Sequence, residues 1–345
     1  MQTPALSLRV LALAFCGCVL LFPAAHAQGS DPEGNAAPKP LFRDPVHDGA
    51  ADPTLIWNRH RKELWMFYTN RRADLSGLEP KDVSWVHGTR IGIAVSRDYG
   101  ATWTYRGVAK IKYGKPDWTQ WAPDIVYERS KYHMFLVIVP GTFKDWNAPR
   151  YIVHLVSRDL EKWRYVGKLD TGSDRIIDPS LFRGPDGTWR IWYKDELDES
   201  HIHYAESSDL VDWKPMGPAI TDRPSEGPKV FRWKNRYWMI VDAWKGLGVY
   251  RSDDLTHWTA QPDNILQQPG TIPTDRNVGD HCDVVVSGDR AFIYYFTAQS
   301  GPDFDKSLPF SDRRTVLQVA ELHESDGVIT VDRNATTHVY LKPPQ

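Results

Sequence analysis

The feature that most constrains this chain is a repeated pair of short apolar runs joined by a tight polar turn. In each pair, an acidic residue lies at or near the start of the first run, and the second run is rich in aromatic residues. Five such pairs follow one another, beginning near Asp52, Trp121, Ile177, Glu226 and Asp280. Short apolar runs bounded by turn residues are typical of β-strands. Their recurrence every ~40–60 residues predicts a repeat architecture.

A second repeat follows in each of the first four units. It has the pattern Ser-x-Asp followed by Trp, and it occupies residues 96–103, 157–163, 207–213 and 252–258. Asp and Ser side chains fold turns by bonding nearby backbone amides, so we interpret these boxes as structural turns that lead into further strands. The fifth unit has no such box, and we expect its third strand over 316–321 and its last within 327–343.

Four antiparallel strands per unit, repeated five times, predict an all-β chain folded as a five-bladed β-propeller. No segment longer than a few residues has helical periodicity. We expect the propeller domain to span residues 42–345. Residues 28–41 are polar and rich in Pro and Gly, which predicts a flexible leader.

Residues 1–27 have the pattern of a secretory signal peptide. Arg9 provides the positive charge, an apolar run extends from Val10 to Phe22, and Ala25-His26-Ala27 is a small-x-small cleavage site. Cleavage after Ala27 predicts a secreted or periplasmic bacterial protein. The apolar run is shorter than a membrane span requires, so we expect no membrane partner.

Charge excludes one further class of partner. The chain carries 42 basic and 44 acidic residues, and this balance gives no reason to expect nucleic acid. Its 15 Trp and 15 Tyr suit carbohydrate, because flat rings stack on the apolar faces of sugars. The sequence gives no indication of oligomeric state. The internal run Lys194-Asp195-Glu196-Leu197 cannot be a retention signal, which must be C-terminal.

In a propeller the first strand of every blade lines the central channel, so equivalent residues form a ring. The candidates for this ring are Asp52, Asp124, Asp178, Glu226 and His281. Crowded carboxyls repel one another, and therefore at least one pKa must rise. One carboxyl can then act as an acid while another stays ionised as a base, which is the pair that glycoside hydrolysis needs.

These motifs resemble glycoside hydrolase family 43, the five-bladed propeller glycosidases, over roughly residues 48–345. Ala51-Asp52-Pro53 looks like the family's general-base motif, and Glu226-Gly227-Pro228 looks like its general acid. Ile177-Asp178-Pro179 resembles the motif of the Asp that tunes the pKa of the acid and orients it. The resemblance implies an inverting, exo-acting enzyme on α-L-arabinofuranosides or β-D-xylosides, with no required cofactor.

The resemblance also implies binding residues. Trp121-Ala122-Pro123-Asp124 matches a motif that shapes the substrate pocket, so Trp121 and Asp124 are candidate substrate contacts. His281 resembles in position the fifth-blade His that, in many members, approaches a central calcium through water, and it is also a candidate substrate contact. The usual motif has a small residue after Gly-His, whereas this chain has Gly279-Asp280-His281-Cys282.

His87 and the run 141–146 lie in inter-strand loops, where sugar contacts commonly form. Two alternatives remain open beside the inverting enzyme. One is a retaining, fructan-type hydrolase or transferase, in which Asp52 would be a nucleophile and Arg would precede the third-blade Asp-Pro. This chain has Ile177 at that position. The other is a sugar-binding propeller without catalysis, although such a protein has no need of crowded carboxyls.

Overall fold

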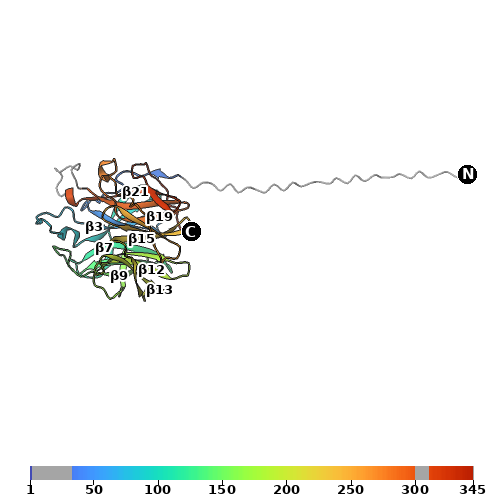
Figure 1. The fold of residues 1–345 in the computed structure, drawn as a ribbon. Coiled ribbons are helices and arrows are strands. Elements are labelled where there is room, and N and C mark those ends of the chain that lie inside the picture. Colours follow the sequence, from blue (N-terminus) through green and yellow to red (C-terminus); the bar gives the residue numbers. More distant parts are fainter. Residues whose placement is uncertain (2–32, 300–310, 345) are drawn as a thin grey trace. The chain divides into compact units, whose positions relative to one another are not determined.

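The computed structural model describes Met1, residues 33–299 and residues 311–344. The predicted signal peptide beyond Met1, and residues 28–32 of the predicted leader, lie outside the described residues. Glu33–Gln345 form one compact unit. It contains five small sheets that follow one another in sequence order as the blades of a propeller (Figure 1). The predicted fold class is therefore confirmed.

Blade 1 contains β2 (Ala50–Asn58), β3 (Glu63–Asn70), β4 (Arg90–Ser96) and β5 (Thr104–Val108). Blade 2 contains β7 (Thr119–Glu128), β8 (Lys131–Val139), β9 (Tyr151–Ser157) and β10 (Lys162–Lys168), with β6 (Lys110–Lys112) added parallel to β10. Blade 3 contains β11 (Ile176–Arg183), β12 (Trp189–Asp195), β13 (His201–Ser207) and β14 (Lys214–Ile220).

Blade 4 contains β15 (Glu226–Trp233), β16 (Arg236–Asp242), β17 (Leu247–Ser252) and β18 (Thr259–Ala260). Blade 5 contains β19 (Asp280–Ser287), β20 (Arg290–Ala298), β21 (Thr315–Ser325) and β22 (Val328–Val331), in agreement with the strands expected there. The helical elements of the described residues are three short 3-10 turns, at Ser84–Val86, Pro273–Asp275 and Ser311–Arg313. None of them is long and apolar enough to cross a membrane.

The Ser-x-Asp boxes form the turns that the sequence predicts. In the second box the Ser157 hydroxyl accepts a hydrogen bond from the Leu160 amide at 2.9 Å, and Asp159 accepts one from the Lys162 amide at 2.9 Å. The indole of Trp163 donates to the Leu160 carbonyl at 3.1 Å. The side chains thus satisfy backbone groups that a tight turn would leave unpaired, and the Trp at the end of the box is buried.

A proline near the start of four first strands creates a bulge in each. The residue before it has a positive φ: 51° at Asp52, 38° at Ala122, 59° at Asp178 and 54° at Gly227. Proline has no N–H for the ladder, and the pairing register shifts at each site. A bulge re-aims the side chain that it contains. In blade 5 the corresponding register shift places His281 in the bulge.

These bulges correct the predicted ring of equivalent residues. Asp52, Asp178 and His281 do occupy corresponding positions, in blades 1, 3 and 5. Glu226 lies one residue before its bulge, and Asp124 lies two residues beyond the equivalent Ala122. Because side chains alternate between the faces of a strand and bulges change that alternation, a difference of one or two positions decides what each side chain faces.

The N-terminal segment joins the last blade. β1 (Asn35–Ala36) pairs antiparallel with β23 (His338–Val339), and Phe42 exchanges backbone hydrogen bonds with Leu317 of β21. The blue and red ends of the described chain accordingly lie together in Figure 1. β21 is longer than its partner β22, so its first residues offer an unpaired edge that the segment covers. Residues 33–41 therefore differ from the predicted flexible leader, because they pair and pack.

Candidate active site

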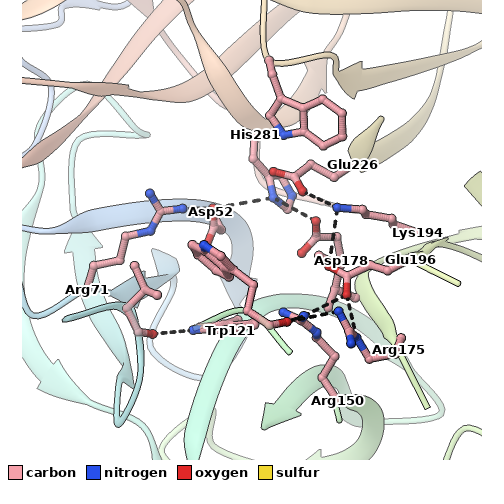
Figure 2. A pocket seen from close by; sticks show the side chains of 14 residues that line it. Asp52, Arg71, Trp121, Arg150, Arg175, Asp178, Lys194, Glu196, Glu226 and His281 are labelled. Carbon is pink, nitrogen blue, oxygen red and sulfur yellow. Dashed lines mark hydrogen bonds and ion pairs between the residues drawn. The ribbon is translucent and has the colours of Figure 1, made fainter. Parts of the chain in front are cut away.

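A cavity of about 330 Å³ opens where loops and strand ends from all five blades meet. The acidic residues and the histidine that line it lie mainly at or beside the bulges of the first strands. The basic residues that line it lie mainly near the ends of other strands or in the loops between strands. The lining residues are Asp52, Arg71, Val86, Trp121, Trp146, Arg150, Arg175, Ile177, Asp178, Lys194, Glu196, Glu226, Trp244 and His281. Figure 2 shows these side chains around the cavity.

The three predicted catalytic carboxyls meet in this cavity beside His281. The Nδ1 atom of His281 lies 3.6 Å from Asp52 Oδ1 and 3.9 Å from Asp178 Oδ2 (Figure 2). Asp178 also accepts a hydrogen bond from the Gly227 amide at 3.1 Å, which ties it to the residue after Glu226. The side chains of Asp52 and Asp178 are each 9% exposed, whereas that of Glu226 is 26% exposed.

Gly227 allows His281 to approach the acids. Its φ of +54° lies in the left-handed region, where glycine carries no steric penalty. A Cβ atom added there would lie 2.6 Å from Cγ of His281. The backbone amide of His281 donates to Asp242 at 2.9 Å, and Asp242 also accepts from the Trp244 amide at 2.8 Å. The imidazole ring of His281 therefore packs against Gly227, which has no side chain, while the backbone amide of His281 is fixed by its hydrogen bond to Asp242.

The acids differ in how strongly they hold a proton. Burial raises the pKa of Asp178 to about 7; the neighbouring charge of His281 opposes this rise, and the carboxyl of Glu226 adds to it. For Glu226 burial also acts to raise the pKa, but the Lys194 ammonium, 2.9 Å from Oε2, together with the Trp244 side chain and the charge of His281, outweighs burial, so the pKa of Glu226 is lowered. The sequence predicted that Asp178 would raise the pKa of Glu226. In the structure, Lys194 has a larger effect on the pKa of Glu226 than Asp178 has.

A buried ion-pair network supports Lys194. Its Nζ atom lies 3.6 Å from Oε1 of Glu196, which follows β12. The other oxygen of Glu196 lies 2.9 Å from Arg150 and 3.0 Å from Arg175. Arg150 is 2% exposed, and charges buried to this degree are normally paired. On the other side of the cavity, Arg71 contacts Asp52 at 3.3 Å. The network holds cations close to both candidate catalytic acids.

Three tryptophans form apolar walls. Trp121 is 8% exposed, and its indole donates to the Val86 carbonyl at 2.6 Å. Trp146 and Trp244 come from the β8–β9 and β16–β17 loops and are 51% and 47% exposed. Large aromatic rings left exposed beside a cavity are typical of binding sites. These rings offer surfaces for a flat apolar ligand face, such as that of a sugar.

Two residues predicted to bind substrate do not line the cavity. Asp124 is 4% exposed and bonds the Leu181 amide and Lys229 deeper in the channel. His87 is fully buried behind the wall, with its ring centroid 5.1 Å from that of Trp121. Burial lowers the pKa of His87 to about 4, so it is neutral at neutral pH. Neither residue reaches the cavity in this structure, where both support the wall or the channel; direct substrate contact by either residue stays a prediction.

The site offers little to a calcium ion. Calcium takes six to eight oxygen ligands, largely carboxylates and carbonyls. His281 faces Asp52 and Asp178, and the channel carboxylates Asp124 and Asp283 already accept N–H donors. Across residues 33–299 and 311–344 no group of three or more His, Cys, Asp or Glu side chains is arranged to hold a metal. The residues present do not fit the ion that the resemblance implies.

Several lining residues are not among those that the sequence predicts. Lys194 and Glu196 lie in the run that was considered only as a retention signal, and Arg71 follows β3. Their shared signal is a charged residue at or just after the end of a blade's second, apolar strand. Trp146 lies in the loop where sugar contacts were expected, and Trp244 lies in the corresponding loop of blade 4.

The cavity thus brings together carboxyls that differ in pKa, a histidine and aromatic walls. One carboxyl whose pKa is near 7 lies beside others that interact closely with cations. Such an arrangement can move a proton onto and off a bound polar molecule. Carboxyl pairs of this kind serve glycoside hydrolysis, where one protonates the leaving oxygen and the other activates water or attacks.

No protein-family model matches the chain. Among solved structures, a thermostable family-43 glycoside hydrolase is 20% identical, with a TM-score of 0.63 over 88% of this chain and 99% of that one. A family-43 β-1,3-galactosidase solved with galactodeoxynojirimycin is 14% identical, with a TM-score of 0.63 over 87% and 99%. A family-43 enzyme from Xanthomonas citri in complex with xylotriose is 15% identical, with a TM-score of 0.61 over 89% and 97%.

A curated relative is a probable sucrose-6-phosphate hydrolase from Psychromonas ingrahamii. It is 27% identical over 177 residues, and the match covers 42% of this chain. The matched stretch spans only about a third (32%) of that relative. The structural likenesses establish a shared propeller fold, and a fold of this kind supports several chemistries.

Proposed function

We propose that this protein is a glycoside hydrolase that acts with inversion on the ends of oligosaccharides or polysaccharides. The observation that carries the proposal is the meeting of Asp52, Asp178 and Glu226, from three different blades, in one aromatic-walled cavity. The fold shared with family-43 glycosidases supports it. Crowded buried carboxyls are costly to maintain, so a protein that only bound sugar would gain nothing from them.

In this proposal Asp52 is the general base and Glu226 is the general acid. Asp52 takes a proton from the attacking water, and Glu226 protonates the departing glycosidic oxygen. Asp178 is a positioning residue, because its carboxyl bonds the Gly227 amide and fixes the backbone next to Glu226. Arg71 lies 3.3 Å from Asp52 and places a positive charge beside the proposed base.

The acid must carry a proton when it reacts. Lys194 lowers the pKa of Glu226, so the fraction of protonated Glu226 falls as the pH rises towards neutrality. We therefore expect the activity to be greatest on the acidic side and to decline towards neutral pH. The main contributor to this dependence is the Lys194 ammonium, 2.9 Å from the carboxyl.

For the substrate we propose α-L-arabinofuranosides or β-D-xylosides. Two of the solved structures that share the fold are described as a β-xylosidase and a β-xylosidase/α-arabinofuranosidase, and another was solved with xylotriose. Trp146 and Trp244 would receive the apolar faces of the sugar rings. The pattern of residues 1–27 supports export of the protein after cleavage behind Ala27.

A retaining mechanism is the second candidate, and the partial match to a probable sucrose-6-phosphate hydrolase favours it. Asp52 would then attack the sugar carbon itself. The residue before Asp178 is Ile177, whereas the fructan-type motif has Arg at that position, and this difference favours the inverting reading.

The experiment compares wild type, Glu226→Gln and Asp52→Asn on two arabinofuranosides and two xylosides that differ in leaving group. A dinitrophenyl leaving group needs little protonation, whereas an alkyl or sugar leaving group needs it strongly. Glu226→Gln should lose about 10²–10⁴-fold in kcat/KM on the poor leaving group and far less on the good one. Asp52→Asn should lose activity on both.

Glu161→Gln, which changes an acid outside the cavity, provides the matched control and should behave as wild type. Full activity of Glu226→Gln on the natural glycoside would refute its role as the acid, and full activity of Asp52→Asn would remove the base. Saturable sugar binding by the wild type without hydrolysis would refute the enzyme and favour a sugar-binding propeller.

A further inference from the structure

Three residues along β15 from Glu226, the chain places a lysine ammonium between two buried carboxylates. The Nζ atom of Lys229 lies 2.8 Å from Asp283 Oδ1 and 3.1 Å from Asp124 Oδ1. The side chains are 16%, 3% and 6% exposed, in that order. The three residues come from the first strands of blades 4, 5 and 2. The ammonium is thus the shared counter-charge of two acids from separate blades.

Both carboxylates also accept hydrogen bonds from groups other than the lysine. Asp124 accepts hydrogen bonds from the Leu181 amide at 2.6 Å and from the Thr54 hydroxyl at 3.1 Å. Asp283 accepts from the Leu55 amide at 2.7 Å and from the Val284 amide at 2.8 Å. Leu55 and Thr54 belong to β2 and Leu181 belongs to β11, so the cluster connects the first strands of all five blades.

The charges favour an ammonium over a second ion at this point. Burial lowers the pKa of Lys229, but Asp124 and Asp283 outweigh it, so the pKa is raised and the lysine stays charged. An ammonium is a compact charge with three donors. Calcium needs six or more oxygen ligands, and here the two carboxylates already accept hydrogen bonds from four donors besides Lys229.

We propose that Lys229 is the resident cation of the central channel, so that the ring of blades is held together without a divalent metal. Its removal should convert Asp124 and Asp283 into a site for a divalent cation, because two buried carboxylates would then lack a counter-charge. The inference concerns the channel and does not depend on which reaction the cavity performs.

The first test uses the wild-type full chain. After dialysis against EDTA, its melting temperature should stay within about 1 °C of the value in millimolar calcium or magnesium, and elemental analysis should find no stoichiometric metal. A clear fall in melting temperature on chelation, or about one calcium per chain surviving dialysis, would overturn the proposal. This test needs no variant and therefore holds even if a channel substitution prevents folding.

The second test uses Lys229→Ala, with Lys234→Ala as a control that removes a more exposed lysine of the same blade, at the β15–β16 turn. Lys229→Ala should melt about 5–10 °C lower in EDTA, as expected for an unpaired buried charge in a chain of this size. Calcium at about ten times its dissociation constant should restore roughly 3 °C. Lys234→Ala should show neither effect.

A third variant identifies the ligands. Lys229→Met combined with Asp124→Asn and Asp283→Asn removes all three charges and should no longer respond to calcium. If calcium raised the melting temperature of Lys229→Ala no more than that of the wild type, or raised that of the triple variant equally, the carboxylates would not form the site and the proposal would fail.

Discussion

Replacing Lys194 by methionine removes the ammonium that pairs with Glu226 while keeping a side chain of similar length. In the wild type Nζ lies 2.9 Å from Oε2 of Glu226 and 3.6 Å from Oε1 of Glu196. The lysine side chain is 7% exposed, so water does not easily replace the lost charge. The variant therefore tests how the proton is placed on the proposed acid.

The size of the effect follows from the contact. At 2.9 Å the Coulomb energy at an effective dielectric constant of about 20 is ~6 kcal/mol, which is an upper figure. Breaking a buried pair typically costs about 3–5 kcal/mol. Because Glu226 is 26% exposed to the cavity, we take the lower end, ~3 kcal/mol. Each 1.4 kcal/mol is tenfold, so protonated Glu226 should become about a hundredfold more favoured.

The direction in which the pH profile should move follows from the role of Glu226 as the proton donor. Activity is lost as the pH rises through the pKa of Glu226, and Lys194 lowers that pKa. Without the ammonium the pKa rises, so the basic limb of the kcat/KM profile should move to higher pH. Lys194→Arg is the matched control, because it keeps the charge and should leave the limb near its wild-type position.

The assay measures kcat/KM for a glycoside with a poor leaving group from about pH 3 to 9 in all three proteins. A basic limb that stays in place in Lys194→Met, with only a uniform loss of rate, would refute the reasoning. So would an equal upward movement in Lys194→Arg, since that would assign the effect to packing and not to charge.

Three further predictions concern the bulge, the buried proton and the N-terminal segment. Gly227→Ala should reduce kcat by at least tenfold, because a Cβ there would lie 2.6 Å from the His281 ring. Its control is Gly217→Ala, at φ +98° with nothing within 4 Å of an added Cβ. This control should lose only about 1–2 kcal/mol of stability through backbone strain and keep its activity. Burial raises the pKa of Asp178 to about 7, so its contribution to folding stability should be present at low pH and be lost as the pH rises from about 4 to 7. In urea titrations, the free energy of unfolding of Asp178→Asn should therefore fall by roughly 2–4 kcal/mol less than that of the wild type over this pH range. An identical fall in both proteins would contradict the assignment. Phe42→Ala should lower the free energy of unfolding by about 3–5 kcal/mol, because Phe42 is 5% exposed against blade 5. An unchanged urea midpoint would show that the N-terminal segment does not stabilise the ring of blades.

The sequence was sufficient for the fold because each blade repeats its own turn chemistry. The Ser-x-Asp boxes bond their own backbone, as at Ser157 and Asp159, so a local pattern reports a local structure. The Asp-Pro pairs at Asp52 and Asp178 marked two bulges that point into the cavity. These features depend on neighbours in sequence and are therefore visible without a structure.

The errors came from register and from long-range contacts. Asp124 follows an Ala-Pro pair, so Ala122 takes the bulge and Asp124 faces Lys229 in the channel. Asp178 instead precedes its proline and takes the bulge itself, so the position of the acid relative to proline separates the two cases, a difference that the ring of equivalent residues overlooked. Lys194 pairs with Glu226, 32 positions away on another blade, and the repeat does not predict that partner.

The N-terminal segment shows the same limit. The composition of residues 28–41 predicts flexibility, but Asn35 and Ala36 pair with β23 near the other end of the chain, and Phe42, the first residue after the predicted leader, pairs with Leu317. The edge that it covers exists because β21 extends beyond β22, and strand lengths of this kind are not marked by residue type alone.

The central claim is that the cavity hydrolyses glycosides with Asp52 as a base and Glu226 as an acid. The most direct measurement is proton NMR of the first-formed product while wild-type enzyme cleaves an arabinofuranoside or xyloside, before mutarotation. With Asp52 as base and Glu226 as acid, the released sugar should have the anomeric configuration opposite to that of the substrate. Retention of configuration would contradict it and would make Asp52 a nucleophile.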